Sequence, residues 1–234
     1  MFLDYYYLVL VLPAVLFSLW ASARVNGTFK KYSRIRNSRG MTGADAARRV
    51  LDANGLYYVR IEHVSGDLTD HYDPKEQVIR LSDSVYGEAT PAAVGVAAHE
   101  AGHAVQHAVG YAPIRIRTAI VPITNIGSRI SIPLILLGLL LSIYGEQFLY
   151  LAYAGVIAFS LCVVFQLVTL PTEFDASRRA VAAIENCGML TPEESRGAKK
   201  VLRAAALTYV AALAVSIMQL LRLILIVGGN RRRD

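Results

Sequence analysis

Four long apolar segments set the strongest limit on how this chain can fold. They cover residues 2–23, 130–145, 148–170 and 204–229. A helix needs about 20 predominantly apolar residues to cross the hydrocarbon core of a bilayer, which is about 30 Å thick. The second segment is short for that thickness, so we expect its helix to begin upstream, between Pro122 and Ser128. The sequence therefore predicts an α-helical integral membrane protein with about four transmembrane helices.

The second and third apolar segments are separated only by Glu146 and Gln147. So short a connection predicts an antiparallel transmembrane hairpin over residues 122–170. The first segment is too long, and lacks the basic start, to be a cleaved signal peptide. Arg222 lies inside the fourth segment, and we expect it either to extend toward the membrane surface or to mark the end of that span.

Most of the basic residues sit beside the apolar segments, on the side of two polar regions at 24–121 and 171–203. Cytoplasmic loops of membrane proteins carry an excess of Lys and Arg. We therefore expect both polar regions in the cytosol and the N-terminus outside, although the short basic tail 230–234 would then lie outside as well. Membrane orientation accounts for the net charge of +6, and nucleic acid is not implied as a partner.

Composition supports a membrane protein and excludes a disulfide framework. Hydrophobic residues make up 54% of the chain and charged residues 18%, with a mean hydropathy of +0.40, which is more apolar than a soluble domain of this length. Cys162 lies in an apolar segment and Cys187 in a polar one, and neither belongs to a Cys-x-x-Cys metal motif. We expect two unpaired thiols.

The first polar region predicts a small α+β unit. Thr42 suits the N-cap of a helix that Asn54-Gly55 would end. Strands are predicted over residues 57–64 and 77–82, with a turn at 73–76 before the second strand. These elements would form a small domain between the first and second membrane spans.

A second helix is predicted from Thr90-Pro91 to Gly110, and it carries the sequence His99-Glu100-Ala-Gly-His103. Positions four apart on a helix lie about 6 Å apart on one face, so the two imidazoles can bind one metal ion. Glu100 can then reach a water molecule beside the metal and act as the general base of a zinc hydrolase. Exposed residues at this spacing are usually a solvated face, but the neighbours here are Ala, Val and Gly.

His107 continues the row of histidines but is not predicted to bind the same ion. It lies about 12 Å from His99 along a straight helix, so the third ligand must come from another segment. Glu173, directly after the third span, is the best candidate, and a site of two histidines and one glutamate leaves a position open for water. The alternative is that Glu173 and Asp175 only favour the N-terminus of a new helix beginning at Pro171-Thr172.

The chain resembles the YugP-type membrane zinc metallopeptidases, and more distantly the membrane gluzincins that include HtpX and the CAAX prenyl proteases. The resemblance covers about residues 41 to 203 and rests on three motifs. These are "VAAHEAGHAVQ", the upstream "LTDHYDP" with "VIRLS", and "LPTEFDASRRA" after the hairpin. It implies a zincin-like domain with Zn²⁺ ligands at His99, His103 and Glu173, and Glu100 as the base.

Three further expectations concern the residues around this site. In the more distant group an aspartate four residues after the ligand glutamate orients a histidine, and this chain has Ser177 there, so Asp175 or another carboxylate would have to substitute. His71 is a candidate donor to the oxyanion of the reaction, or alternatively a residue that caps a turn. The strand at 77–82 would offer an edge to an extended substrate.

The sequence thus predicts a membrane-embedded zinc endopeptidase that cleaves membrane-associated or misfolded proteins at the cytosolic face. Its partners would be a protein or peptide substrate and the lipid bilayer, with membrane proteins or further copies of the chain as additional partners. The alternative is a non-catalytic component of a quality-control assembly in which zinc only stabilises the fold. The predicted domains are a span at 1–23, the α+β domain at 24–121, the hairpin at 122–170, a helical segment at 171–203, a span at 204–229 and the tail at 230–234.

Overall fold

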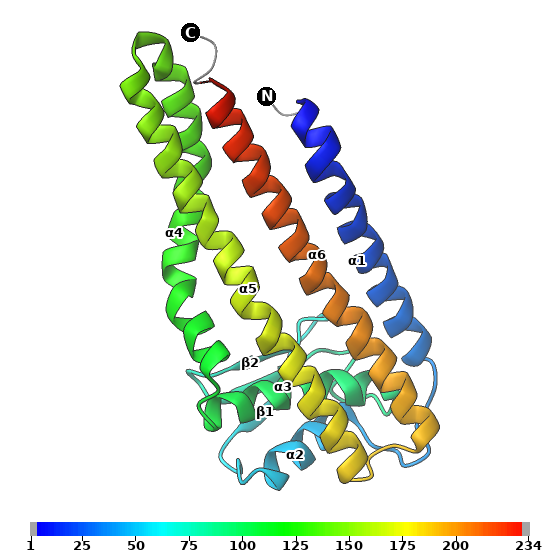
Figure 1. Ribbon diagram of the computed structural model, residues 1–234. Coiled ribbons are helices and arrows are strands. Elements are labelled where there is room, and N and C mark those ends of the chain that lie inside the picture. The colour runs from blue at the N-terminus through cyan, green and yellow to red at the C-terminus, as the bar shows by residue number, and fades with distance from the viewer. Residues whose placement is uncertain (1–3, 231–234) are drawn as a thin grey trace. The chain divides into compact units, whose positions relative to one another are not determined.

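The computed structural model describes residues 4–230, and this part of the chain is mostly helical (Figure 1). The first helix begins as a π-helix at Tyr7–Val11. The α-helices are α1 (Leu12–Tyr32), α2 (Gly43–Ala53), α3 (Pro91–Ala108), α4 (Ala112–Leu141), α5 (Leu149–Asn186) and α6 (Pro192–Asn230). The strands are β1 (Arg60–His63), β2 (His71–Asp73) and β3 (Val78–Leu81). The predicted tail lies outside the described residues except for Asn230.

Four of these helices are long and apolar enough to cross a membrane, as the sequence predicts. The candidate spans are Tyr7–Tyr32, Ala112–Tyr144, Glu146–Asn186 and Pro192–Gly229. The second helix begins at Ala112, about ten residues before the expected start, and contains both Pro122 and Pro133. The hairpin turn uses two short 3₁₀ helices, Ser142–Tyr144 and Glu146–Phe148, on either side of Gly145.

The helix expected to start at Pro171 is not separate, because α5 passes through Pro171 without ending. Proline removes one helical hydrogen bond and tends to kink a helix. The residues that follow bury Ala176, Ala180 and Ile184 at 1% exposure or less, and this burial favours continuing the helix. The expectation of a new N-terminus beside Glu173 is therefore wrong, so a preference for helix starts cannot explain Glu173.

The chain divides into two compact units that share the long helices. The first unit, which we call the apolar unit, comprises residues 1–20, 116–170 and 209–234. The second unit, the motif unit, comprises residues 21–115 and 171–208 and contains α2, α3 and the sheet.

Arg222 of α6 forms an ion pair with Asp4 within the apolar unit. Its Nη2 lies 2.6 Å and its Nε 3.1 Å from Oδ2 of Asp4, and its guanidinium stands 5.4 Å from the ring centre of Tyr7. The residue is 8% exposed and α6 continues beyond it. Both expectations for the place of Arg222 in a membrane stay predictions, and the structure adds that Asp4, just before the first helix, holds its charge.

The sheet of the motif unit has the order β1-β3-β2. β1 pairs parallel to β3, with Ile61 opposite Ile79, and β2 pairs antiparallel to β3, with Tyr72 opposite Ile79. The short strand β2 was not predicted, and it makes β3 the central strand. The expectation that residues 77–82 offer a free edge is therefore wrong, because β1 and β2 already occupy both sides of β3.

Sequence signals at the helix starts are confirmed. The hydroxyl of Thr42 accepts a hydrogen bond from the backbone N–H of Asp45, whose carboxylate accepts one from the Thr42 N–H in return. The hydroxyl of Thr90 accepts from the N–H of Ala93, and Pro91 takes the first helical position. These caps fix where α2 and α3 begin, and α3 then runs through the core of the motif unit.

Candidate metal centre

Helix α3 crosses α5 at very short range, and Gly102 makes this possible. A methyl group on Gly102 would lie 2.9 Å from the carbonyl oxygen and 3.3 Å from the Cα of Ala176, which is too close for any side chain. On α3, alanine residues 97, 98, 101 and 104 are almost completely buried. Small residues therefore let the backbone of α3 approach the part of α5 that carries Glu173.

Three side chains predicted as ligands converge at this crossing. The Nε2 atoms of His99 and His103 lie 3.2 Å and 3.5 Å from Oε2 of Glu173. One donor atom from each residue lies within 4.8 Å of the other two, so a single ion could contact all three. Glu173 is 2% exposed and His103 is 9% exposed, which places the cluster inside the motif unit.

The hydrogen bonds of His103 fix which of its nitrogens faces the cluster. Its Nδ1 lies 3.0 Å from Oε1 of Gln106, and the amide Nε2 of Gln106 donates to the carbonyl of Thr172 and to Asp175 at 2.8 Å and 3.0 Å. Both of those partners can only accept, so the amide nitrogen must point at them and its oxygen at His103. Nδ1 of His103 is then the protonated nitrogen, and Nε2 offers its lone pair toward Glu173.

This donor set suits zinc. Two imidazole nitrogens and a carboxylate oxygen are its usual ligands in hydrolases, and three protein ligands leave a fourth position for water. Lone pairs of His103 and Glu173 that face each other at 3.5 Å are also stabilised by a cation between them. The residues present therefore fit the zinc ion that the sequence predicts.

Ser177 contacts a candidate ligand directly, whereas Asp175 acts through another residue. The hydroxyl of Ser177 lies 3.1 Å from Nδ1 of His99, so a serine contacts the histidine at the position where the more distant resemblance would place an aspartate. Asp175 contacts neither histidine. Its carboxylate accepts from Gln106, from Arg178 and, at 2.6 Å, from Arg179, and so supports His103 through Gln106.

Sequence reasoning did not identify Gln106. It is completely buried, and it is the link between His103 on α3 and the Thr172–Asp175 stretch on α5. A signal was available in the sequence, because Gln106 lies three residues after His103 and residues at that spacing share a helix face. A polar amide among Ala and Val on the same face as a ligand would have indicated a supporting hydrogen bond.

Glu100 is half-buried beside the three candidate ligands. Burial raises the pKa of its carboxyl, while the nearby His103 and His99 act to lower it and Glu173 and Asp70 act to raise it. Asp70, just before β2, holds Ser82 through the Ser82 backbone N–H at 2.8 Å and its hydroxyl. A carboxyl with a raised pKa is a better proton acceptor near neutral pH than an ordinary glutamate.

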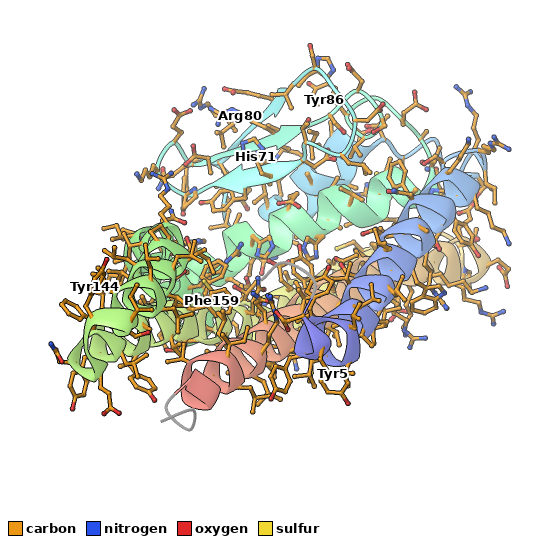
Figure 2. The ribbon with its side chains drawn as sticks, turned by 90° about the horizontal axis from the view of Figure 1, so that it is seen from above. Tyr5, His71, Arg80, Tyr86, Tyr144 and Phe159 are labelled. Carbon is orange, nitrogen blue, oxygen red and sulfur yellow. The ribbon has the colours of Figure 1, made fainter. Side chains whose placement is uncertain are left out.

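His107 and His71 are not part of the three-residue cluster. The ring of His107 lies 5.6 Å from that of Tyr72 on β2. His71 lies in the sheet (Figure 2). Because side chains alternate along a strand, it points to the face opposite Tyr72. It is exposed, and its Nδ1 bonds the carbonyl of Thr69 at 2.8 Å.

Comparison with known proteins defines the class. A model of the family described as "Putative neutral zinc metallopeptidase" matches residues 7–228. The chain therefore belongs to this family of zinc metallopeptidases. It is 47% identical over 225 residues to the protein described as "Putative membrane protease YugP" of Bacillus subtilis (strain 168), which covers 96% of this chain and 98% of that protein. These matches confirm the resemblance predicted from the motifs. No solved structure matches the chain.

Proposed function

We propose that the chain is a membrane-bound zinc endopeptidase that cleaves membrane-associated or misfolded proteins at the cytosolic face. The observation that carries the proposal is the convergence of His99, His103 and Glu173 beside a half-buried Glu100. His99, His103 and Glu173 would hold the zinc ion. When bound, the ion supplies Lewis acidity, which lowers the pKa of a water molecule and polarises the substrate carbonyl.

Glu100 performs the proton transfers in this proposal. Its carboxylate accepts a proton as the water oxygen bonds to the scissile carbonyl carbon, and it returns that proton to the amine nitrogen as the C–N bond breaks. The raised pKa of Glu100, caused first by burial, suits both transfers. Gln106 and Ser177 keep the Nδ1 side of each imidazole engaged, so that the rings keep their orientation while the proton moves.

Replacing Glu100 by Gln in the full-length protein tests the base directly. Cleavage of a casein substrate by the zinc-loaded variant should fall by about 10²- to 10⁴-fold, because Gln cannot accept the proton. Zinc content should remain near that of the wild type. Glu88→Gln, at an exposed glutamate before α3, is the matched control and should leave cleavage unchanged.

Two results would contradict this proposal. Unchanged cleavage by Glu100→Gln would remove Glu100 from the mechanism, and loss of zinc from that variant would make Glu100 a ligand. If zinc-loaded wild-type protein cleaves neither casein nor membrane-protein substrates, the non-catalytic alternative holds, in which zinc only stabilises a component of a quality-control assembly.

The cytosolic placement is a separate part of the proposal and rests on the basic residues beside the apolar segments. In a background without Cys162 and Cys187, a cysteine at Lys30 should be protected from an impermeant thiol reagent in intact cells. A cysteine at Glu146 should be labelled. The reverse pattern would place the site on the outer face.

A further inference from the structure

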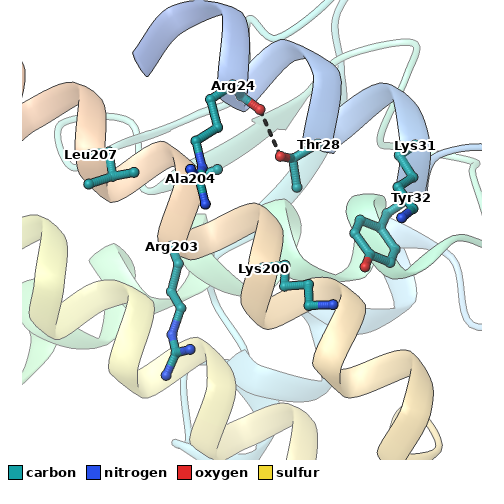
Figure 3. A pocket seen from close by; sticks show the side chains of 8 residues that line it. All are labelled: Arg24, Thr28, Lys31, Tyr32, Lys200, Arg203, Ala204 and Leu207. Atoms are coloured by element: carbon teal, nitrogen blue, oxygen red, sulfur yellow. Dashed lines mark hydrogen bonds between the residues drawn. The ribbon is translucent and has the colours of Figure 1, made fainter. Parts of the chain in front are cut away.

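A second site lies between α1 and α6 in the motif unit, formed by residues that take no part in the metal centre. The pocket has a volume of about 400 Å³ (Figure 3). Its lining consists of four cations, one hydroxyl, one aromatic ring and two apolar side chains. These residues are Arg24, Thr28, Lys31, Tyr32, Lys200, Arg203, Ala204 and Leu207.

The charge of this pocket is of one sign. Arg24 and Lys31 come from α1, Lys200 and Arg203 come from α6, and the lining includes no carboxylate. Like charges gathered around one concave surface repel one another and raise the local concentration of anions. An anion with several oxygens, such as a phosphate group, would relieve this repulsion and accept hydrogen bonds from both lysine and arginine.

Close packing between the two helices fixes their spacing beside the pocket. A methyl group on Gly197 of α6 would lie 2.7 Å and 2.9 Å from ring atoms of Tyr32 on α1, so glycine lets the ring rest directly on the α6 backbone. The ammonium of Lys31 lies 5.6 Å from the centre of the same ring. The wall of the pocket is therefore fixed by backbone packing.

The position of the pocket along both helices indicates the source of the phosphate. On α1 the predicted apolar segment ends at residue 23, just before Arg24, and on α6 it begins at residue 204, just after Arg203. Ala204 and Leu207 also line the pocket, which gives it an apolar side next to the cations. A ligand with a phosphate beside hydrocarbon matches both kinds of lining, and basic pockets at the ends of membrane helices bind anionic headgroups.

We propose that this pocket binds the headgroup phosphate of an anionic phospholipid. A soluble phosphate shares the charge but has no hydrocarbon to contact Ala204 and Leu207. The apolar lining therefore favours the lipid. This site is independent of peptide hydrolysis and does not require the metal.

The test uses detergent-purified, full-length protein titrated with dioleoylphosphatidylglycerol, with bound lipid counted by native mass spectrometry. Lys200→Gln combined with Arg203→Gln should weaken retention of this lipid by roughly 30-fold, because each cation contributes on the order of a tenfold factor or less. The matched control, Arg196→Gln with Lys199→Gln, removes the same charges from the same helix outside the pocket lining and should retain the lipid.

Further arms separate the sources and guard against misfolding. Lys200→Arg with Arg203→Lys keeps the charge and should restore binding, and Arg24→Gln with Lys31→Gln should reproduce the loss from the α1 side. Dioleoylphosphatidylcholine and inorganic phosphate should not displace the bound lipid. Equal loss from the pocket and control pairs would show only general attraction to positive charge, and displacement by inorganic phosphate would show a soluble-anion site. Either result, or failure of both pocket pairs to weaken binding, overturns the proposal.

Discussion

The two units of the chain stabilise apolar side chains in different ways. The motif unit has a continuous core, in which α2, α3, the sheet and the adjoining parts of α5 and α6 bury large and small residues together. In the apolar unit the buried cluster consists, within residues 4–230, of Ile135, Ala152, Leu223 and Val227. Many other large side chains of this unit are exposed, such as Leu140 at 64% and Ile126 at 62%. The motif unit therefore buries its apolar side chains in its own core, whereas the exposed apolar surface of the apolar unit fits helices long and apolar enough to cross a membrane.

The two units also differ in how they stabilise buried polar and charged side chains. In the motif unit the buried polar residues His103, Gln106, Glu173 and Asp175 form one connected network around a common point. In the apolar unit Arg222 pairs with the carboxylate of Asp4 and donates a hydrogen bond to Oε1 of Gln219 at 3.4 Å. A connected network is typical of a functional site, whereas the contacts of Arg222 are enough to keep one charge among apolar helices.

The largest expected effect concerns Glu173, the proposed ligand on α5. Glu173→Ala should lower zinc affinity more than the 10- to 100-fold typical of losing a supporting residue, because it removes a direct metal–oxygen bond. Zinc content after dialysis against a graded chelator series measures this. His107→Ala is the control on α3 and should retain zinc. If Glu173→Ala retains zinc and His107→Ala loses it, the ligand assignment is wrong.

Unfolding measurements on a pair of leucines test the comparison of the cores. Leu51 in α2 is completely buried in the motif unit, and Leu51→Ala should lower the free energy of unfolding by about 2–5 kcal/mol. Leu140→Ala in the apolar unit should change it by about 0.5 kcal/mol or less, because that side chain already lies on the surface. Chemical unfolding in detergent measures both, and equal losses would mean that the apolar unit has a core of its own.

Much of the division into an apolar unit and a motif unit could be predicted from the sequence. Hydropathy marks the four long helices, and residues such as Thr42, Thr90 and Pro91 mark helix starts, since both signals depend on local chemistry. Pairing between distant segments could not be predicted in the same way. The strand β2 has only three residues, and the partners of Arg222 and Gln106 lie far away in the chain. Glu173 was predicted because three ligands were required, so chemistry supplied a long-range constraint there.

A pair of glycines on α3 tests whether close helix packing builds the metal centre. Gly102→Ala should destabilise the protein by about 1–3 kcal/mol and weaken zinc binding, because its methyl group would meet the α5 backbone at 2.9 Å. Gly95→Ala is the matched change, with its nearest neighbour, the Cβ of Ala198, at 3.3 Å. It should cost less and leave zinc affinity unchanged. If both variants lost zinc affinity equally, the close approach of α5 near Ala176 would not be what determines zinc binding.

Replacing Gln106 tests the network around the ligands. Gln106→Ala leaves His103 without its acceptor and should lower zinc affinity by about 10- to 100-fold, measured by competition with a chelator. Gln106→Glu keeps an oxygen near His103 but places a second carboxylate against Asp175, so it should restore binding only in part. Wild-type affinity in Gln106→Ala would show that packing alone orients the imidazole.

The smallest expected effect is the coupling between Asp4 and Arg222 in the apolar unit. Asp4→Asn keeps an oxygen that can accept the Tyr7 N–H now bonded to Oδ1 at 2.9 Å, so this change removes the charge while preserving the cap. Together with Arg222→Gln and the double variant it forms a cycle, and Arg129→Gln on α4 is the exposed control. The coupling energy should be about 0.6 kcal/mol and no more than about 1.7 kcal/mol, as for other polar pairs within membrane helices. The side chain of Asp4 is 26% exposed, which favours the lower part of that range.

Unfolding in detergent micelles measures the stability of the four proteins of the cycle and of the control. A coupling of zero would show that Arg222 is stabilised by solvent, by Gln219 or by the Tyr7 ring, and that its pair with Asp4 does not contribute to stability.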